Sequence, residues 1–224
     1  MQDPQAFWNA RYADAGFAYG TAPNDFVVEV ATRIPQGPVL CLAEGEGRNA
    51  VYLASLGHEV TAMDLSVVGL EKAQALAKER GVTLKTMAAD LSTYVIEEGH
   101  WSASVCIWMH LPKALRAQVL ASAASGLKPG GLLILESYTP AQLEFNTGGP
   151  RDVGMLVAPG DLRDELASLS IDVFETMERE VHEGPFHDAG VPSYGLSQDA
   201  SKSKVYARSE GHPNESPHRR AAKA

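Results

Sequence analysis

The chain is poor in the features that mark secreted, metal-binding and membrane proteins. Only 2 of its 224 residues are cysteines. Cys41 and Cys106 each lie inside an apolar segment without C-x-x-C spacing, so we expect two buried, reduced, unreactive thiols and no metal site. No apolar run approaches the ~20 residues that cross a bilayer, and the first residues lack the apolar core of a secretory signal. The sequence therefore predicts a cytoplasmic protein that does not enter a membrane.

Basic residues are also in the minority. The chain holds 19 Lys and Arg against 28 Asp and Glu, which gives a formal net charge of −9 and a pI near 5.2. Such a surface lacks the broad positive potential that attracts nucleic acids or anionic membranes. We therefore expect a small-molecule substrate and no nucleic-acid partner.

Apolar runs alternate with helical periods along most of the sequence. This order is typical of one doubly wound α/β domain, a Rossmann-like, mostly parallel sheet with helices on both faces. The expected strands lie near residues 38–43, 59–63, 83–87, 103–108, 131–136 and 171–181. The expected helices lie near residues 47–56, 66–80, 112–125 and 161–168.

The two ends of the chain differ in composition from this domain. Residues 1–37 indicate two short helices joined by an aromatic turn, a cap over the carboxyl ends of the strands. Residues 38–208 hold the domain itself. Residues 209–224 are polar and contain proline, so we expect a disordered tail.

The segment Pro38–Ala50 combines an apolar run, a glycine-spaced turn and the start of a helix. Gly45 and Gly47 permit backbone angles that a side chain forbids, so the main chain can approach a ligand at the mouth of a parallel sheet. The spacing also fits a dinucleotide fingerprint, with Asp64 near the ~20-residue offset of a ribose-binding carboxylate. A glycine turn without a ligand is the third interpretation.

The charges on this turn distinguish the ligands. A pyrophosphate prefers a helix N-terminus without carboxylates, whereas this turn carries Glu44 and Glu46. Like charges near contact repel by about 4 kcal/mol at an effective dielectric near 20. S-adenosylmethionine has no phosphate and carries sulfonium and ammonium cations. The turn therefore favours this methyl donor over NAD(P), although Arg48 could offset part of the acidity and either glutamate could face solvent.

Polar residues follow the other predicted strands. Asp64 could accept hydrogen bonds from both ribose hydroxyls, or it could cap the next helix, a role that Ser66 could take instead. Asp90 could accept from an adenine amino group beside the Leu91 N–H, or it could be a solvated loop residue. His110 could be a proton acceptor, a polar wall or a helix cap.

These motifs resemble those of class I S-adenosylmethionine-dependent methyltransferases, and more narrowly the tellurite-resistance and thiopurine-type branch of small methyltransferases. The resemblance implies methyl transfer to a small acceptor such as a thiol or a chalcogen oxyanion. The segments that carry it span roughly residues 7–187 and are Phe7-Trp8-x-x-Arg11-Tyr12, Tyr19-Gly20-Thr-x-Pro-Asn24-x-Phe26, Ala43–Asn49, Asp64-Leu-Ser66, Leu127–Gly131 and Asn146–Pro150.

The resemblance also implies the residues that hold S-adenosyl-L-methionine. Trp8, Arg11 and Tyr19 would close over the donor, with Arg11 able to meet its carboxylate; packing on the sheet is the alternative for Trp8. The remaining donor-binding candidates follow strands or form the turn, and they are Ala43, Glu44, Gly45, Gly47, Asn49, Asp64, Leu65, Ser66, Asp90, Leu91 and Met109.

The chemistry of the acceptor decides whether a proton must move. A thiolate or a chalcogen oxyanion needs no base, because it attacks without losing a proton. For a hydroxyl or an amine, His110, Tyr138 and His187 are the candidate catalytic residues.

The sequence departs from the class in two places. Cys41 stands where many class I enzymes have an acidic residue, and Ala43 where they have glycine, which predicts weaker donor binding. Residues 191–199 contain proline and glycine before Val205–Arg208, so we expect the seventh strand to be short, displaced or missing. An NAD(P)-binding oxidoreductase and a non-catalytic cofactor-binding scaffold are the alternative functions.

Overall fold

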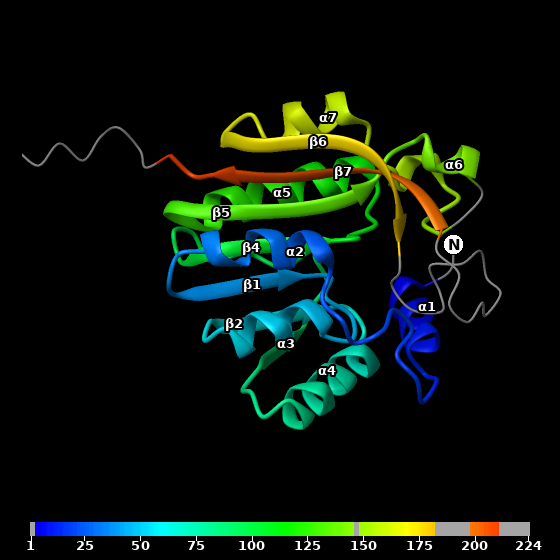
Figure 1. The fold of residues 1–224 in the computed structure, drawn as a ribbon, viewed down its shortest axis with the longest axis vertical. Helices are drawn as coiled ribbons and strands as arrows, with labels where there is room; N and C mark the ends of the chain where they lie inside the picture. Colours follow the sequence, from blue (N-terminus) through cyan, green and yellow to red (C-terminus); the bar gives the residue numbers. More distant parts are fainter. Residues whose placement is uncertain (1–2, 146–147, 182–197, 211–224) are drawn as a thin grey trace, which may run out of the picture.

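The protein is built on one seven-stranded, mostly parallel sheet (Figure 1). The computed structural model describes residues 3–145, 148–181 and 198–210. The strands are β1 Pro38–Leu42, β2 Glu59–Asp64, β3 Lys85–Ala88, β4 Trp101–Ile107, β5 Leu127–Tyr138, β6 Ser170–Val181 and β7 Gln198–Arg208. Their order in the sheet is β3-β2-β1-β4-β5-β7-β6, and β7 runs antiparallel to both β5 and β6. The predicted fold class is confirmed.

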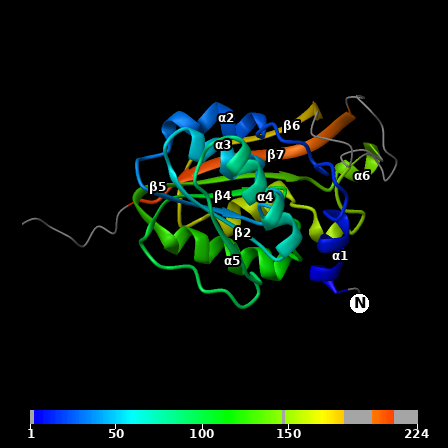
Figure 2. The ribbon, with the colours of Figure 1, turned by 90° about the horizontal axis from the view of Figure 1, so that it is seen from below.

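Helices cover both faces of the sheet, and two lie beyond its end. The helices are α1 Pro4–Arg11, α2 Asp25–Val30, α3 Arg48–Ser55, α4 Val67–Glu79, α5 Lys113–Gly126, α6 Gln142–Phe145 and α7 Pro159–Glu165. Figures 1 and 2 show α2, α3 and α4 on one face and α5 on the other, while α1 and α6 lie past the carboxyl ends of the parallel strands. The N-terminal segment therefore reaches the edge where doubly wound sheets bind their ligands.

Polar caps fix the starts of three of these helices. Asp3 accepts from the backbone N–H of Gln5 at the start of α1, and Asn24 accepts from two N–H groups of α2. Ser66 accepts from the N–H of Gly69 at the start of α4. Such caps satisfy N–H groups that have no partner within the helix, so α1, α2 and α4 begin at defined residues.

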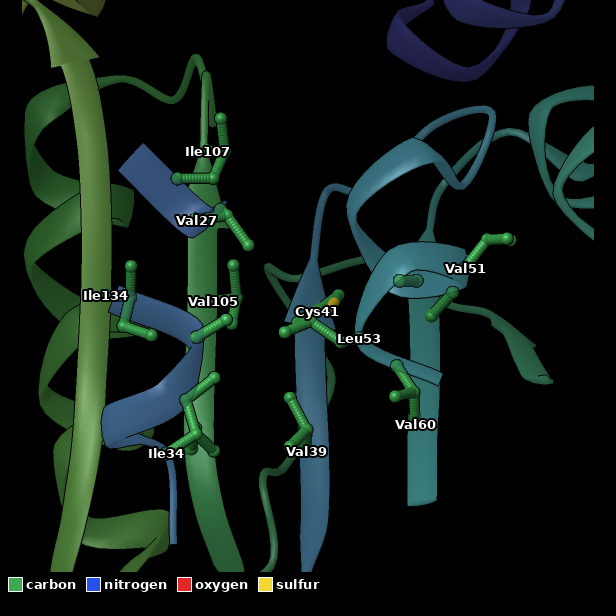
Figure 3. Close-up of a cluster of buried hydrophobic side chains, with 14 of the residues drawn as sticks. Val27, Ile34, Val39, Cys41, Val51, Leu53, Val60, Val105, Ile107 and Ile134 are labelled. Carbon is green, nitrogen blue, oxygen red and sulfur yellow. The ribbon is translucent and has the colours of Figure 1, made fainter. Parts of the chain in front are cut away.

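The core consists of two apolar layers, one on each side of the sheet. Successive residues of a strand point to opposite faces, and Figure 3 shows Val39 and Cys41 of β1 among side chains of α2 and α3. The alternate residues Leu40 and Leu42 pack with α5 instead. Cys41 and Cys106 are both free and buried, as predicted, and burial raises the pKa of the Cys106 thiol to about 12.

The expectation of a short, displaced or missing seventh strand is wrong. β7 pairs with β5 from Leu132 opposite Arg208 to Tyr138 opposite Lys202, and it also pairs with β6 along its length. The proline and glycine of residues 191–197 precede this strand. Its polar residues Ser201, Lys202 and Ser203 are buried beside polar partners from other elements, as in the contact between the Thr139 and Ser201 hydroxyls at 2.7 Å, so a polar sequence forms an interior strand.

The remaining predictions concern the domain boundaries, the C-terminal tail, and membrane or metal-binding features. Sheet formation begins at Pro38, but the division into a cap of residues 1–37 and a domain of residues 38–208 stays a prediction. Residues 211–224 of the expected tail lie outside the described residues. Within the described ranges, no helix is long and apolar enough to cross a membrane, and no three His, Cys, Asp or Glu residues gather as a metal site would require.

Helices α3 and α4 approach each other closely at Gly47. This residue precedes α3 with a φ of 89°, and a Cβ built on it would lie 2.4 Å from the Cβ of Ala73 in α4. Gly57 has a nearly equal φ of 91° but has nothing within 4 Å of such a Cβ. The two glycines therefore separate the cost of backbone conformation from the cost of crowding.

We expect Gly47→Ala to destabilise the protein by roughly 2–5 kcal/mol, the sum of ~1–2 kcal/mol for a left-handed side-chain-bearing residue and ~1–3 kcal/mol for overpacking. Gly57→Ala should cost only the ~1–2 kcal/mol for the left-handed backbone conformation. Urea unfolding of both variants measures the difference. Equal losses would show that the contact with Ala73 does not require glycine.

Candidate active site

Two strained residues mark the point where the strand order reverses. In the described chain, Ala43 and Trp108 are the non-glycine residues with positive φ, at 52° and 57°. Ala43 directly follows β1 and Trp108 directly follows β4, and these neighbouring strands are followed by strands that lie on opposite sides of them. Ligands of open α/β sheets bind at such a switch point, and strained backbone gathers at functional sites. The candidate site is therefore the carboxyl edge of β1 and β4.

The carboxylate of Glu44 caps helix α3. Its Oε1 accepts from the N–H of Asn49 at 2.9 Å and from the N–H of Ala50 at 2.8 Å. Burial raises the pKa of Glu44 to about 7, although these N–H groups and the Arg48 charge favour its ionised form. Two N–H groups at the start of α3 that could receive a phosphate are therefore bound to a side chain of the protein itself.

Glu46 holds the N-terminal segment instead of facing a ligand or solvent. Its Oε2 accepts from the N–H of Ala18 at 2.7 Å, and its other oxygen pairs with Lys72 of α4. Lys72 also donates to the backbone carbonyls of Tyr12 and Asp14, at 3.3 and 3.0 Å. The two glutamates of the turn thus have different partners, which their close positions in the sequence do not reveal.

Protein side chains fill the space beside the glycines of the turn. Gly45 has a φ of 62°, and a Cβ on it would lie 2.6 Å from the hydroxyl of Tyr12. The contact of Gly47 with Ala73 is of the same kind. These contacts give a packing reason for glycine at both positions, and the role of their main chain in ligand binding stays a prediction. Tyr12 belongs to one of the motifs that carry the resemblance, but its place at the turn was not predicted from the sequence.

Asp64 lies at the end of β2, next to this turn. Its Oδ2 accepts from the N–H of Gly45 and its Oδ1 from the N–H of Ser66, both at 2.8 Å. Burial raises the pKa of Asp64, while the backbone N–H groups of Ser66, Gly45 and Leu65 oppose this shift. A carboxylate has about four acceptor positions, so three N–H donors leave room for one more donor such as a hydroxyl.

Ser66 resolves the question of which residue caps α4. Its hydroxyl accepts from Gly69 at 3.1 Å and donates to Oδ1 of Asn9 in α1 at 2.7 Å. The Leu65 carbonyl accepts from the Gln5 side chain at 3.0 Å. Both Ser66 and Leu65 therefore connect the start of α4 to α1, and Asp64 is not the cap.

The aromatic residues of the N-terminal segment gather over the turn. Trp8 stacks on Tyr12 with ring centroids 5.6 Å apart, and Tyr12 meets Tyr19 edge to face at 6.4 Å. Arg48 donates to the Tyr19 carbonyl at 3.3 Å. The charge of Arg11 acts to lower the pKa of Tyr19, although burial, the largest cause, raises it. Trp8, Arg11 and Tyr19 thus lie together at the turn.

Residues after β3 extend the same edge. The Ala89 N–H donates to the Asp64 carbonyl at 3.0 Å, so the segments of Asp64 and Asp90 are neighbours. Asp90 is exposed, and its carboxylate accepts from the Ser92 N–H at 2.8 Å, which lowers its pKa. Leu91 and Met109 pack in the apolar layer on the α5 side.

Three rings lie together where β4 and β5 end. Tyr138 stacks on Trp108 at 4.3 Å and on His110 at 5.8 Å between centroids. Tyr138 is buried, whereas Trp108 and His110 are half-buried. The structure thus brings His110 and Tyr138 together, and His187 lies outside the described residues. Trp108 was not among the residues predicted for the site; its bulk directly after an apolar strand was the available signal.

A buried polar network connects the turn to these rings. The Asn24 N–H donates to Oδ1 of Asn49 at 2.8 Å, and the Asn24 side chain donates to Glu136. Glu136 also pairs with Lys202, whose Nζ lies 5.5 Å from the centre of the Trp108 ring. Sequence reasoning predicted no site role for Asn24, Glu136 or Lys202, because their partners are distant along the chain.

Comparisons with known proteins agree with this geometry. Residues 39–131 match the family model described as a methyltransferase domain. The 2-heptyl-1-hydroxyquinolin-4(1H)-one methyltransferase of Mycobacteroides abscessus is 28% identical over 120 residues, 52% of this chain and 53% of the relative. The ubiquinone biosynthesis O-methyltransferase of Xanthomonas campestris is 30% identical over 138 residues, 58% of this chain and 57% of the relative. The chain therefore spans about half the length of these curated relatives.

Solved structures share the fold over most of the chain. A protein from a study of the conversion of a disulfide bond into a thioacetal group during echinomycin biosynthesis has a TM-score of 0.73 and 18% identity, covering 93% of this chain and 92% of its own. TehB from Haemophilus influenzae has a TM-score of 0.67 and 17% identity, covering 92% and 67%. The [4+2]-cyclase SpnF has a TM-score of 0.63 and 18% identity, covering 92% of each chain. Residues 39–131 are therefore similar to a methyltransferase domain, and the solved structures show that the chain shares their fold.

Proposed function

We propose that the protein transfers the methyl group of S-adenosylmethionine to a small-molecule acceptor. The observation that carries this proposal is the carboxylate of Glu44 on the N–H groups of Asn49 and Ala50. A pyrophosphate would have to displace this carboxylate and would meet its negative charge. A donor with cationic groups and no phosphate fits the same turn, which argues against the NAD(P)-dependent oxidoreductase.

The donor's parts can be assigned to residues along the edge. Asp64, with acceptor capacity left on its carboxylate, suits the ribose hydroxyls, and Asp90 with Leu91 suits the adenine. Glu44 suits the ammonium group and Arg11 the carboxylate of the methionine part. The backbone around these contacts belongs to the other donor-binding candidates, Ala43, Gly45, Gly47, Asn49, Leu65, Ser66 and Met109.

The reaction then needs positioning more than it needs acid–base chemistry. Bound S-adenosylmethionine supplies a methyl group on a sulfonium that is its own leaving group. Holding reactants at ~3–3.5 Å can contribute ~7–11 kcal/mol to lowering the barrier. Trp8, Tyr12 and Tyr19 would exclude water on the side of the N-terminal segment. His110 suits proton removal from a hydroxyl or amine better than Tyr138, because Tyr138 is buried and His110 is half-buried.

The acceptor class is open to a direct assay. The sequence motifs favour thiols and chalcogen oxyanions, and the narrower placement in the tellurite-resistance and thiopurine-type branch is part of this proposal. One curated relative is named for a hydroxyquinolinone and another for O-methylation, which favours hydroxylated rings as a second class. The two free, buried cysteines agree with a cytoplasmic location, which we also propose.

Incubation with methyl-labelled donor tests the reaction. We expect label to move to at least one member of a panel of thiols, selenite, tellurite and hydroxylated aromatic compounds. A cyclase with this fold shows that the fold alone does not fix the reaction. Donor binding without transfer to any panel member would favour the non-catalytic scaffold.

We expect S-adenosylmethionine or S-adenosylhomocysteine to raise the unfolding free energy by about 2.7 kcal/mol at a hundredfold excess over Kd. Asp64→Asn should lose most of this gain, measured against its own ligand-free melting temperature. Asp172→Asn, in an exposed ion pair with Arg208 on β6 and β7, is the control and should keep the full shift. A shift with NADH and none with either sulfur compound would instead support the oxidoreductase.

A further prediction concerns how Glu44 makes folding stability and donor affinity depend on pH. Burial raises its pKa from 4.5 to about 7, so between these values the folded protein binds a proton that the unfolded chain releases. The contribution of Glu44 to stability is therefore full below pH 4.5 and is lost as the pH rises through 7. A cationic donor requires the ionised carboxylate, so donor affinity should increase from pH 6 to pH 8.

Glu44→Gln separates these two effects. The amide keeps an oxygen acceptor for the start of α3 and has no charge to bury. We expect the ligand-free variant to be at least as stable as the wild type at pH 8 but to bind donor about tenfold more weakly, ~1.4 kcal/mol, without the pH dependence. Calorimetric titrations at pH 6, 7 and 8 measure this, and unchanged affinity at pH 8 would contradict the role of Glu44.

A further inference from the structure

A fully buried ion pair lies next to the strained residue Trp108. The side chains of Glu136 on β5 and Lys202 on β7 are 0% and 1% exposed. Lys202 is directly opposite Tyr138 in the antiparallel register, and the Trp108 N–H donates to the Glu136 carbonyl at 3.0 Å. Neighbouring strands thus bring the pair, Tyr138 and Trp108 to one place at the carboxyl end of β4 and β5.

Stability does not account for this arrangement. A pair of buried charges loses more hydration than two apolar side chains of similar volume, and replacing such pairs by apolar residues is often neutral or stabilising. Trp108 adds a second cost, because a bulky residue with a φ of 57° is a genuine backbone outlier. Two unfavourable features side by side at the switch point of the sheet indicate a function.

The pair also joins the two halves of the site. Glu136 accepts from the Asn24 side chain, and the Asn24 N–H donates to the Asn49 side chain. The Asn49 N–H in turn donates to Glu44 at the donor turn. On its other side, Lys202 contacts the Trp108 ring, with Nζ 5.5 Å from the centroid, within the range of a cation–π interaction. The rings at the end of β4 are thereby fixed relative to the turn.

We propose that Glu136 and Lys202 are positioning residues for Trp108, and that Trp108 forms one wall of the methyl-acceptor site. The assignment of Trp108 to an acceptor site rests on the proposed function. The pair itself is too deeply buried to touch an acceptor and acts through the half-buried indole. Loss of the pair therefore weakens acceptor binding and leaves donor binding in place.

The double variant Glu136→Gln/Lys202→Met tests the proposal. It replaces the ion pair by neutral side chains of similar length, so that neither charge is left buried alone, as it would be in either single variant. We expect the variant to fold and to bind S-adenosylhomocysteine within about twofold of the wild-type Kd. Its KM should rise about tenfold for the panel acceptor that the wild type methylates best, with a smaller change in kcat, as expected for lost acceptor binding.

A cycle with Trp108→Ala separates positioning from a general structural role. If the pair acts through the indole, neutralising it in the Trp108→Ala background produces no further change in KM. If the pair acts elsewhere, the fold-changes in KM from neutralising the pair and from Trp108→Ala multiply. Multiplying effects, or an unchanged acceptor KM in the folded double variant, would overturn the proposal.

A spectroscopic measurement tests the positioning without any acceptor. The chain has 3 tryptophans, so the changes Trp8→Phe and Trp101→Phe, used only for this measurement, leave Trp108 as the single indole. We expect Glu136→Gln/Lys202→Met to shift the Trp108 emission and to increase its quenching by acrylamide. If the wild type methylates no acceptor, the proposed function fails, and this signal still decides the link between pair and indole. Unchanged emission and quenching would refute it.

Discussion

The hydrogen bonds from the start of α3 to the Glu44 carboxylate are the constraint on which the site depends. They join the turn after β1 to the helix that follows it, at 2.9 and 2.8 Å. They also disfavour a phosphate at this turn, because a helix N-terminus that already holds an internal carboxylate has little to offer one. The glycine spacing alone, which also fits a dinucleotide fingerprint, therefore does not determine the ligand.

The N-terminal segment completes this arrangement by packing on the turn from outside the sheet. Tyr12 lies against Gly45 and also against Gly69, where a Cβ would come within 2.9 Å of its ring. Lys72 joins the carbonyls of this segment to Glu46. One glycine motif thus meets a helix on one side and an aromatic segment on the other, and both contacts need residues without side chains.

Local patterns sufficed to predict the parallel strands, the main helices and the placement of Asp64 at a strand end, because these depend on periodicity and on residues close in sequence. The roles of Glu136 and Lys202 could not be predicted in this way. Lys202 lies in a polar stretch whose burial depends on a distant partner. This partner is Glu136, which lies 66 positions earlier in the chain. Glu46 and Glu44 are separated by one residue, yet their different partners are set by the tertiary fold. Burial of a charged side chain is a property of its surroundings, which a linear pattern does not contain.

Glu44 places a negative charge near Cys41, the position at which many related enzymes have an acidic residue. Many class I enzymes resembled by this chain carry an acid where it has Cys41, and the absence of that acid predicted weaker donor binding. The charge of Glu44 acts on Cys41, where it adds to burial in raising the pKa of the thiol. A carboxylate is therefore present beside position 41 although none is present at it. Because electrostatic interaction depends on distance and not on the position in sequence, Glu44 can supply negative charge to this turn although position 41 holds none.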